Sequence, residues 1–251
     1  MRDYQAEFEG RVAYIRSLVE SAHASGIVFG NSGGKDSALV GILCKAACEN
    51  TVGVIMPCAS RRNYGADAAD GRALAEAFGI ETRTVDLSSA REALVTAVGE
   101  AAALNDMALN NLAPRLRMTA LYAVAAAENR LVAGTGNRSE IYMGYFTKWG
   151  DGASDFDPIA DLTATEVFAF LEYLKAPRQV IDKAPSAGLF DGQTDEQEMG
   201  VRYAAIDEWI LHGTGGEDDL AVIRRFHARS EHKRRPISTY RGSVGQSGQD
   251  S

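Results

Sequence analysis

A glycine-rich segment, GNSGGKDS from Gly30 to Ser37, has the residue types that bind phosphate groups. Gly33 and Gly34 carry no Cβ and can adopt positive φ, so successive backbone N–H groups can point at one anion. The apolar run 27–29 before the segment predicts a buried strand, and the apolar spacing from Ser37 onward predicts a helix. The loop therefore leads into the N-terminus of a helix, where the helix dipole favours an anion.

Two common phosphate-binding patterns do not match this loop. A Walker loop requires Gly, four residues and then Gly-Lys-Ser/Thr, but Phe29 takes the place of the first glycine and Asp36 follows Lys35. A dinucleotide fingerprint requires G-x-G-x-x-G, which neither GNSGGKDS nor the later GTGNRS contains. The remaining string, SGGKDS, resembles the pyrophosphate loop of the ATP pyrophosphatases, which split ATP to AMP and pyrophosphate. This match indicates nucleotide binding and says little about the second substrate.

A second polar turn, GTGNRSE over 134–140, follows a predicted strand at 131–133. In open parallel sheets, ligands lie outside the carboxyl ends of the strands near a switch in strand order. We therefore expect GNSGGKDS and GTGNRSE to face one crevice, with Asp86 at the end of the third predicted strand as a candidate to join them. The glycine- and aspartate-rich stretch from Gly144 to Asp157 predicts a long ordered loop over that crevice.

Strands and helices are expected to alternate along the chain. Such alternation predicts an α/β fold, with a doubly wound, Rossmann-like parallel sheet that carries helices on both faces in a single domain. We expect this domain to span residues 1–235 and the Gly- and Ser-rich residues 236–251 to form a flexible C-terminal tail. The expected strands are 27–29, 51–56, 81–87 and 131–133, and the expected helices are 3–24, 37 onward, 69–78, 89–105, 113–129, 163–174, 195–211 and 218–229.

Composition excludes several classes of protein. A formal net charge of −8 argues against a broad nucleic-acid-binding surface, so no nucleic-acid partner is expected. No apolar run is long enough for a membrane span, and the charged N-terminus lacks the apolar segment of a signal peptide, so no membrane partner and a cytoplasmic location are expected. Cys44, Cys48 and Cys58 lack metal-binding spacing and are expected to be core residues.

Several separated strings resemble one family within the ATP pyrophosphatases, the ammonia-dependent NAD synthetases. The resemblance implies that the chain makes NAD from deamido-NAD, ATP and ammonia through an NAD-adenylate intermediate, releasing AMP and pyrophosphate. No covalent enzyme intermediate is needed, so catalysis should rest on positioning and charge stabilisation. The matching strings are NLAPRLRMTALY, LVAGTGNRSE, GYFTKWGDGASDFDPIADL, KAPSAGLFDGQTDEQEMGVRY, SGGKDS and HKR.

The resemblance implies a site for ATP and Mg²⁺. Magnesium prefers one or two carboxylates together with phosphate oxygens and water, and the family's two metal carboxylates map onto Asp36 and Glu140. Both residues can also be read as acids that stabilise a helix N-terminus. Thr135 and Ser186 can equally be ordinary turn residues. The implied ATP contacts are Gly30, Asn31, Ser32, Gly33, Gly34, Lys35, Asp36, Ser37, Thr135 and Ser186.

Deamido-NAD is anionic, so an acidic protein needs local cations to bind it. The resemblance also implies a catalytic residue, Asp151, near the ammonia pocket, where a carboxylate can attract ammonium and accept its proton. The HKRR run can also be a solvated basic tail, and Lys148 can be a simple salt-bridge partner. The implied deamido-NAD contacts are Arg115, Lys148, Asp155, His232 and Lys233.

One position departs from the family pattern. Ala164, in DLTATEV, stands where the family has a lysine, so a cationic contact to phosphate is missing unless Lys35 or Lys183 substitutes for it. Two other functions remain open. A tRNA-modifying adenylating enzyme would bring a broad basic surface, zinc cysteines or an RNA-binding domain, none of which is visible. A nucleotide-binding module that has lost catalysis would not be expected to keep the three implied site carboxylates.

The nitrogen source and the oligomeric state follow from the same resemblance. Some relatives carry a glutamine-hydrolysing domain about as large as this whole chain, and there are no spare residues for one here, so free ammonia is the expected donor unless a separate glutaminase delivers it. Members of the family are homodimers, and the apolar helices over 93–124 are the expected interface.

Overall fold

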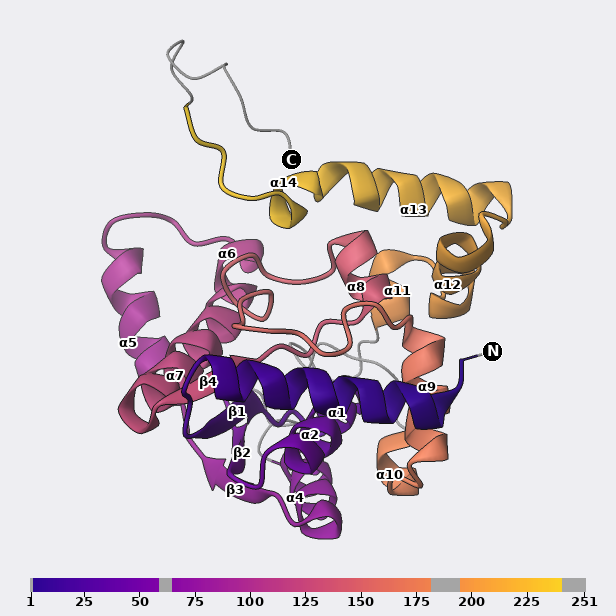
Figure 1. Cartoon of the computed structure of the whole chain (residues 1–251). Coiled ribbons are helices and arrows are strands. Elements are labelled where there is room, and N and C mark those ends of the chain that lie inside the picture. Colours follow the sequence, from indigo (N-terminus) through magenta and orange to yellow (C-terminus); the bar gives the residue numbers. More distant parts are fainter. Residues whose placement is uncertain (1, 59–64, 182–194, 241–251) are drawn as a thin grey trace.

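Four parallel strands form the sheet at the centre of the computed structural model, which describes residues 2–58, 65–181 and 195–240 (Figure 1). The strands are β1 (Gly26–Gly30), β2 (Thr51–Ile55), β3 (Glu81–Thr84) and β4 (Arg130–Ala133), in the order β3-β2-β1-β4. The order reverses between β1 and β4, so the chain leaves these two neighbours in opposite directions across the sheet and a crevice opens beyond their carboxyl ends.

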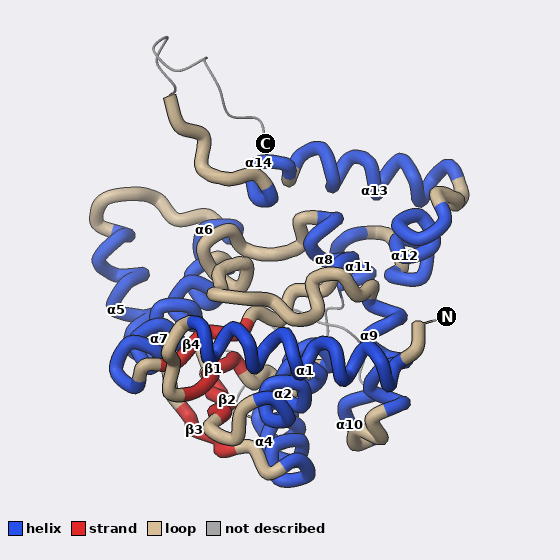
Figure 2. Tube along the Cα trace, in the orientation of Figure 1, coloured by secondary structure: helices blue, strands red, loops and turns tan. Residues whose placement is uncertain are grey.

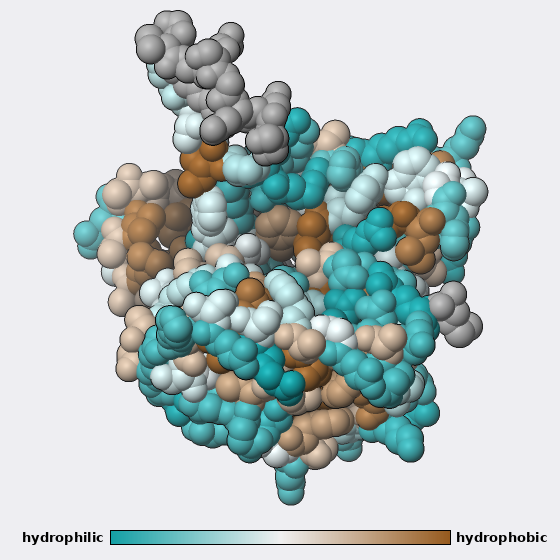
Figure 3. Space-filling model, viewed as in Figure 1, coloured by the Kyte–Doolittle hydropathy of each residue, from teal (hydrophilic) through white to brown (hydrophobic). Residues whose placement is uncertain are grey.

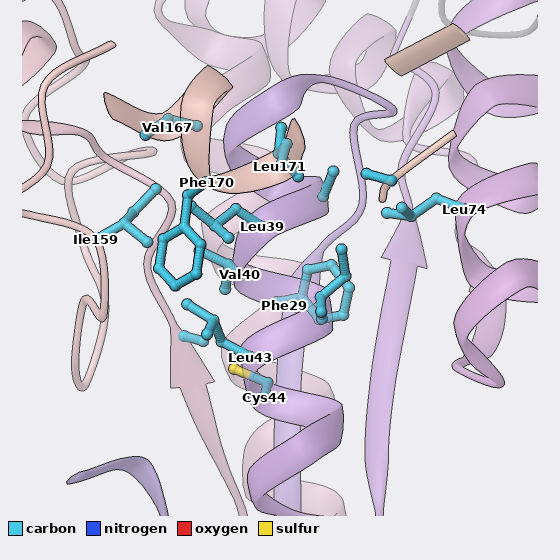
Figure 4. Packing of buried hydrophobic residues seen from close by; sticks show 14 of the residues in the cluster. Phe29, Leu39, Val40, Leu43, Cys44, Leu74, Ile159, Val167, Phe170 and Leu171 are labelled. Atoms are coloured by element: carbon cyan, nitrogen blue, oxygen red, sulfur yellow. The ribbon is translucent and has the colours of Figure 1, made fainter. Parts of the chain in front are cut away.

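Helices cover both faces of the sheet, which confirms the predicted doubly wound α/β fold. Phe29 of β1, Leu39 and Leu43 of α2 (Lys35–Ala47) and Phe170 of α9 (Ala164–Tyr173) all belong to the larger core cluster (Figure 4). The same cluster takes in α1 (Tyr4–Ser21), α4 (Ala66–Phe78) and α10 (Arg178–Ile181). On the opposite face, valines of β1, β2 and β4 pack beneath α7 (Leu112–Glu128).

The edge strand is shorter than predicted. β3 ends at Thr84 rather than continuing to Leu87, although the N–H groups of Val85 and Leu87 still donate to carbonyl oxygens of the β2 side. Asp86 was expected near the crevice, but its Oδ1 accepts from Ser88 N at 2.9 Å, at the start of α5 (Ser88–Gly99), and it does not line the cavity described below. Its short side chain bonds the local backbone at the helix start instead of facing a ligand.

Two long predicted helices are each interrupted. The 195–211 prediction is wrong because Gly200, with φ of +73°, ends α11 (Asp195–Met199) before α12 (Tyr203–His212) begins. The 89–105 helix stops at Gly99, and Asn105 then caps a separate helix, α6 (Asp106–Asn110). Figure 2 shows the loop that separates α5 from α6. A glycine with positive φ can end a helix, and an asparagine N-cap can start one, even where the apolar spacing continues.

A third layer lies beyond the carboxyl edge of the sheet. It consists of α8 (Arg138–Met143), α11, α12, α13 (Glu217–Arg229) and the short α14 (Glu231–Arg234), seen above the sheet in Figure 1. Met143, Ile206 and Ile223 are fully buried between α8, α12 and α13. The predicted tail from 236 lies mostly outside the described residues, and no described helix is long and apolar enough to cross a bilayer.

Candidate active site

A cavity of about 1120 Å³ opens at the carboxyl ends of β1 and β4, between the sheet and the third layer. Its wall includes Lys35 and Asp36 from the glycine-rich loop, and Thr135 and Glu140 from the second polar turn. The two turns therefore face one crevice, as their positions after parallel strands predicted. The surface in Figure 3 is hollowed between α13 above and α1 below.

The glycine-rich loop is held in shape by its own side chains. Gly33 has φ of +71°, and a Cβ there would lie 2.3 Å from the Asp67 carbonyl oxygen, so only glycine fits. Asn31 Nδ2 donates to Gly71 O at 2.8 Å, and Asn31 Oδ1 accepts from Gly33 N at 3.3 Å. Gly34 is the N-cap of α2 without a side-chain cap from any described residue. The first-turn N–H groups of α2 are thus suited to bind a phosphate.

Asn137 joins the two carboxylates that the sequence assigned to magnesium. Its Nδ2 donates to Asp36 Oδ1 at 3.0 Å, across 101 positions of sequence. It is also the N-cap of α8, where Asn137 Oδ1 accepts from Glu140 N at 3.0 Å and Asn137 N donates to Glu140 Oε2 at 3.1 Å. This reciprocal capping box fixes Glu140 beside Asp36.

The electrostatics of this pair suit a cation. Burial raises the pKa of Glu140 well above its usual value, and the nearby charge of Asp36 raises it further. Within the described part of the chain, no three His, Cys, Asp or Glu residues gather as a metal cage. Two carboxylates beside a phosphate loop nevertheless fit Mg²⁺, which keeps several water ligands and takes phosphate oxygens from its substrate.

The long loop over 144–157 supplies a third carboxylate, Asp151. Its Oδ1 accepts from Thr147 N at 2.9 Å, and the residue lines the cavity. Asp151 is an exposed residue, and desolvation of its carboxylate by the surrounding protein raises its pKa. Lys233 and Arg117 oppose this rise by attracting the charged form.

Comparison with known proteins identifies the family. The family model described as NAD synthase matches residues 7–239. The chain belongs to the NAD synthase family. It is 45% identical to the NH(3)-dependent NAD(+) synthetase of Carboxydothermus hydrogenoformans, over 93% of this chain and 96% of the relative. The predicted membership of the ammonia-dependent NAD synthetases is confirmed.

Solved structures share the fold over nearly the whole chain. The NMN synthetase of Francisella tularensis superimposes with a TM-score of 0.91 at 37% identity, covering 96% of this chain and 99% of the other. The NH3-dependent NAD synthetase of Campylobacter jejuni, solved with a nitrate ion, gives a TM-score of 0.78 at 29% identity, covering 96% and 100%. Both similarities extend through the third layer that closes the cavity.

Two of the implied substrate contacts, His232 and Lys233, lie at the end of the cavity around α14. Lys233 Nζ donates to Gly144 O at 2.7 Å and to Phe146 O at 2.6 Å, and it stacks on the Phe146 ring. Burial lowers the pKa of Lys233. Lys233 and His232 both line the cavity. The ammonium group of Lys233 keeps one further N–H for an anionic ligand.

Three implied substrate contacts do not line the cavity. Lys148 Nζ donates to His232 O at 2.6 Å, and Arg115 Nη2 donates to Lys148 O at 3.4 Å, so both lie beside the rim formed by α14. Asp155 anchors the long loop to the sheet instead, because its Oδ2 accepts from Val132 N at 2.8 Å and its Oδ1 accepts from Tyr122 OH at 3.2 Å. Their contact with deamido-NAD stays a prediction.

The ATP contacts divide in the same way. Thr135 and every residue of the 30–37 segment except Gly33 line the cavity, whereas Ser186 lies outside the described residues. Ala164, at the family's lysine position, is fully buried and its N–H donates to Ser139 Oγ at 3.0 Å. Of the two candidate substitutes, Lys35 lines the cavity and Lys183 lies outside the described residues.

Sequence reasoning missed two polar residues of the site, Asp157 in the cavity wall and Asn137 behind it. Asp157 accepts from Gly136 N at 2.9 Å and from Ile159 N at 3.1 Å, and burial raises its pKa to about 6. Its place depends on a single parallel bridge between Ala133 and Phe156, which carries the loop back beside β4. A bridge of one residue pair is too short to produce a periodic pattern in the sequence. Asn137 could have been found from the N-x-x-E spacing of the capping box.

The C-terminal end of α8 is tied to the start of α14. Gly144 caps α8 with φ of +66°, and a Cβ at this position would lie 2.0 Å from Ser230 Cβ. Ser230 Oγ also donates to Met143 O at 3.1 Å. Glycine is therefore required both for its backbone angle and for the close approach.

Proposed function

We propose that this enzyme forms NAD from deamido-NAD, ATP and ammonia, with AMP and pyrophosphate as the other products. The observation that carries the proposal is the joining of Asp36 to Glu140 through Asn137, beside a phosphate loop and in one cavity with Asp151. A site of this kind can hold a nucleoside triphosphate, a divalent cation and a nucleophile together. The family membership supports the same reaction.

The first step activates a carboxylate. An oxygen of the nicotinate carboxylate attacks the α-phosphorus of ATP, the bond to the bridging oxygen breaks, and pyrophosphate leaves. The N–H groups of the glycine-rich loop, together with Lys35, bind and orient the phosphates. Mg²⁺, held by Asp36 and Glu140 with phosphate oxygens and water, would neutralise charge on the triphosphate.

The second step transfers nitrogen. Ammonia attacks the carbonyl carbon of the NAD-adenylate, and AMP leaves as the C–O bond breaks. Asp151 is placed to attract ammonium into the cavity and to accept its proton, since the raised pKa brings a carboxylate closer to the basicity that proton transfer needs. Phe146 and several residues of 144–152 line this part of the cavity.

An assay that measures NAD and AMP in one incubation tests the reaction. The full chain is incubated with ATP, Mg²⁺, ammonium and deamido-NAD, and NAD and AMP are expected in equal amounts. Omission of deamido-NAD should abolish AMP release. AMP formed at the same rate without it, or no NAD with all four present, contradicts the proposal. Glutamine in place of ammonium should give no product unless a separate glutaminase is added.

One observation makes nicotinate mononucleotide an alternative acid substrate to deamido-NAD. The NMN synthetase structure superimposes better, at a TM-score of 0.91, than the NAD synthetase structure from Campylobacter jejuni, at 0.78. Nicotinate mononucleotide carries the same carboxylate and ring as deamido-NAD and differs in lacking the adenylate half. The ratio of kcat/KM for the two acids, measured in one preparation, decides which is the substrate; we expect the dinucleotide to be preferred.

We further propose a homodimer in the cytoplasm. None of the twelve residues of α5 is buried, although Ala93, Leu94 and Val95 lie on it, and Met107 on α6 is 72% exposed. Leu94 and Val95 are half-buried and Met107 is exposed, and such incompletely buried apolar residues on successive helices support an interface between copies of the chain. Sedimentation at micromolar concentration should give a dimer, and Met107→Glu together with Leu94→Glu should give a monomer.

A further inference from the structure

Lys35 is a buried cation inside the glycine-rich loop. Its side chain is 4% exposed, and Nζ lies 2.5 Å from Asp36 Oδ2. The rings of Phe168 and Tyr203 flank the ammonium group, with centroids at 5.7 and 5.4 Å from Nζ. A lysine so enclosed keeps its charge only because carboxylates surround it.

The carboxylates around Lys35 include Asp36 and Glu140, the two residues that would bind magnesium. Asp36, Glu140 and Asp195 each attract the charge of Lys35. Asp36 has a donor on each oxygen, since Asn137 Nδ2 donates to Oδ1 and Lys35 Nζ donates to Oδ2. Each oxygen keeps a second lone pair, so a metal ion can bind Asp36 beside a donor, but an ion on Oδ2 would lie close to the ammonium group of Lys35. Lys35 repels such an ion, whereas the neutral Asn137 does not.

The phosphate site offers Lys35 a second set of partners. Lys35 is the first residue of α2 and lines the cavity together with Ser32, Gly34 and Ser37, where the ATP phosphates are proposed to bind. The flexible four-carbon stem allows the ammonium group to reach different oxygens without a backbone change. A triphosphate supplies more negative charge than the one carboxylate that Lys35 would give up.

We propose that Lys35 is a partner-exchanging cation: in the nucleotide-free enzyme it occupies Asp36 in place of the metal, and on ATP binding it moves to a phosphate oxygen and releases Asp36 to Mg²⁺. This inference rests on the proposed use of ATP and Mg²⁺. Its consequence is that metal binds weakly to the empty enzyme and tightly only together with nucleotide.

The proposal predicts that one substitution, Lys35→Met, strengthens metal binding to the empty enzyme and weakens the binding of ATP. Lys35→Met removes the cation that competes with the metal, so Mn²⁺ should bind the nucleotide-free enzyme about tenfold more tightly. The same substitution removes a phosphate contact, so the KM for ATP should rise about tenfold. A lysine that only bound phosphate would leave Mn²⁺ binding to the empty enzyme unchanged.

The experiment is a titration of the full chain with Mn²⁺ in the absence of nucleotide. The electron paramagnetic resonance signal of the free ion measures how much Mn²⁺ is bound. Lys45→Met is the matched control, because Lys45 lies on the same helix and pairs with Glu49 at 2.6 Å on the surface. The control should bind Mn²⁺ like the wild type, and Lys35→Arg, which keeps the charge, should bind it as weakly. Mn²⁺ binding by Lys35→Met that equals or falls below the wild type overturns the proposal.

A second measurement does not depend on the variant folding. The measurement is a crystal structure of the wild type with Mg²⁺ and α,β-methylene-ATP, an analogue that cannot transfer its adenylate to the acid. In this complex Lys35 Nζ should contact a phosphate oxygen and no longer Asp36. Lys35 still on Asp36 in that complex overturns the exchange. Asp36→Asn serves a different purpose: if, in the presence of α,β-methylene-ATP, it binds Mn²⁺ as tightly as the wild type does, the metal site of the proposed function fails, whatever Lys35 does.

Discussion

The two ends of the cavity are built differently. At the end beside the sheet, charged side chains bond to other side chains, as Asp36 does with Lys35 and Asn137. At the end beside α14, lysines bond to backbone carbonyl oxygens, as Lys233 does with Gly144 and Phe146. Charges at the sheet end can exchange partners with a ligand, whereas cations at the α14 end also hold the long loop in place. Substitutions should therefore change chemistry at one end and loop position at the other.

The largest effect is expected at the sheet end. Glu140→Gln should lower kcat/KM by roughly 10³-fold, because the metal loses a charged ligand. The fold should survive, since Gln can keep the capping box with Asn137 and no longer buries a charge. Initial rates and thermal melting check this, with the exposed Glu76→Gln as control. A Glu140→Gln enzyme with wild-type pyrophosphate release would remove Glu140 from the site.

A smaller loss is expected for the carboxylate between the two ends. Asp151→Asn should slow NAD formation by about 10²-fold, because proton transfer from ammonium is lost. Adenylation should continue, so exchange of labelled pyrophosphate into ATP should stay within about threefold of the wild type. The exposed Glu76→Gln is again the control. Equal losses in exchange and amidation would show that Asp151 acts before nitrogen transfer.

At the α14 end the expected change is in binding. Lys233→Met should raise the KM for the acid substrate about tenfold and speed amide hydrogen exchange over 144–151, since two bonds to the loop are lost. Lys148→Met removes a bond to His232 O outside the cavity and should change KM less than about threefold. A rise in KM without faster exchange would mean that Lys233 contacts substrate without positioning the loop.

The smallest effect concerns pH. Because burial raises the pKa of Asp157 from 3.8 to about 6, the folded state prefers the protonated form, and this stabilisation is lost as pH rises through 6. Between pH 5 and 7.5 the wild type should lose about 1 kcal/mol of unfolding free energy relative to Asp157→Asn. Urea denaturation at the two pH values measures the difference. A parallel pH dependence of the two proteins would contradict it.

The contrast between the ends also explains what the sequence could predict. The phosphate loop and the second turn follow strands of the sheet, so strand periodicity together with the rule for parallel sheets brought them together. The 144–157 loop has no period, and its path depends on contacts such as Asp155 with Val132 N. Predictions there came from resemblance, and Asp157 was missed. The prediction of one helix over 195–211 was wrong because a single glycine is tolerated within many helices, and the sequence alone does not show that Gly200 adopts a positive φ.

The short helix α8 acts as a spacer between the two ends. Glu140 lies in its first turn and Gly144, at its end, is pressed against Ser230 at the start of α14. About 6 Å of helix therefore separates the metal carboxylate from the anchor of the basic end, at 1.5 Å per residue. One inserted residue would lengthen this spacer by about 1.5 Å and rotate Glu140 by about 100°, away from Asp36. The length of α8 thus sets the separation between the carboxylate of Glu140 and the place where α14 is anchored.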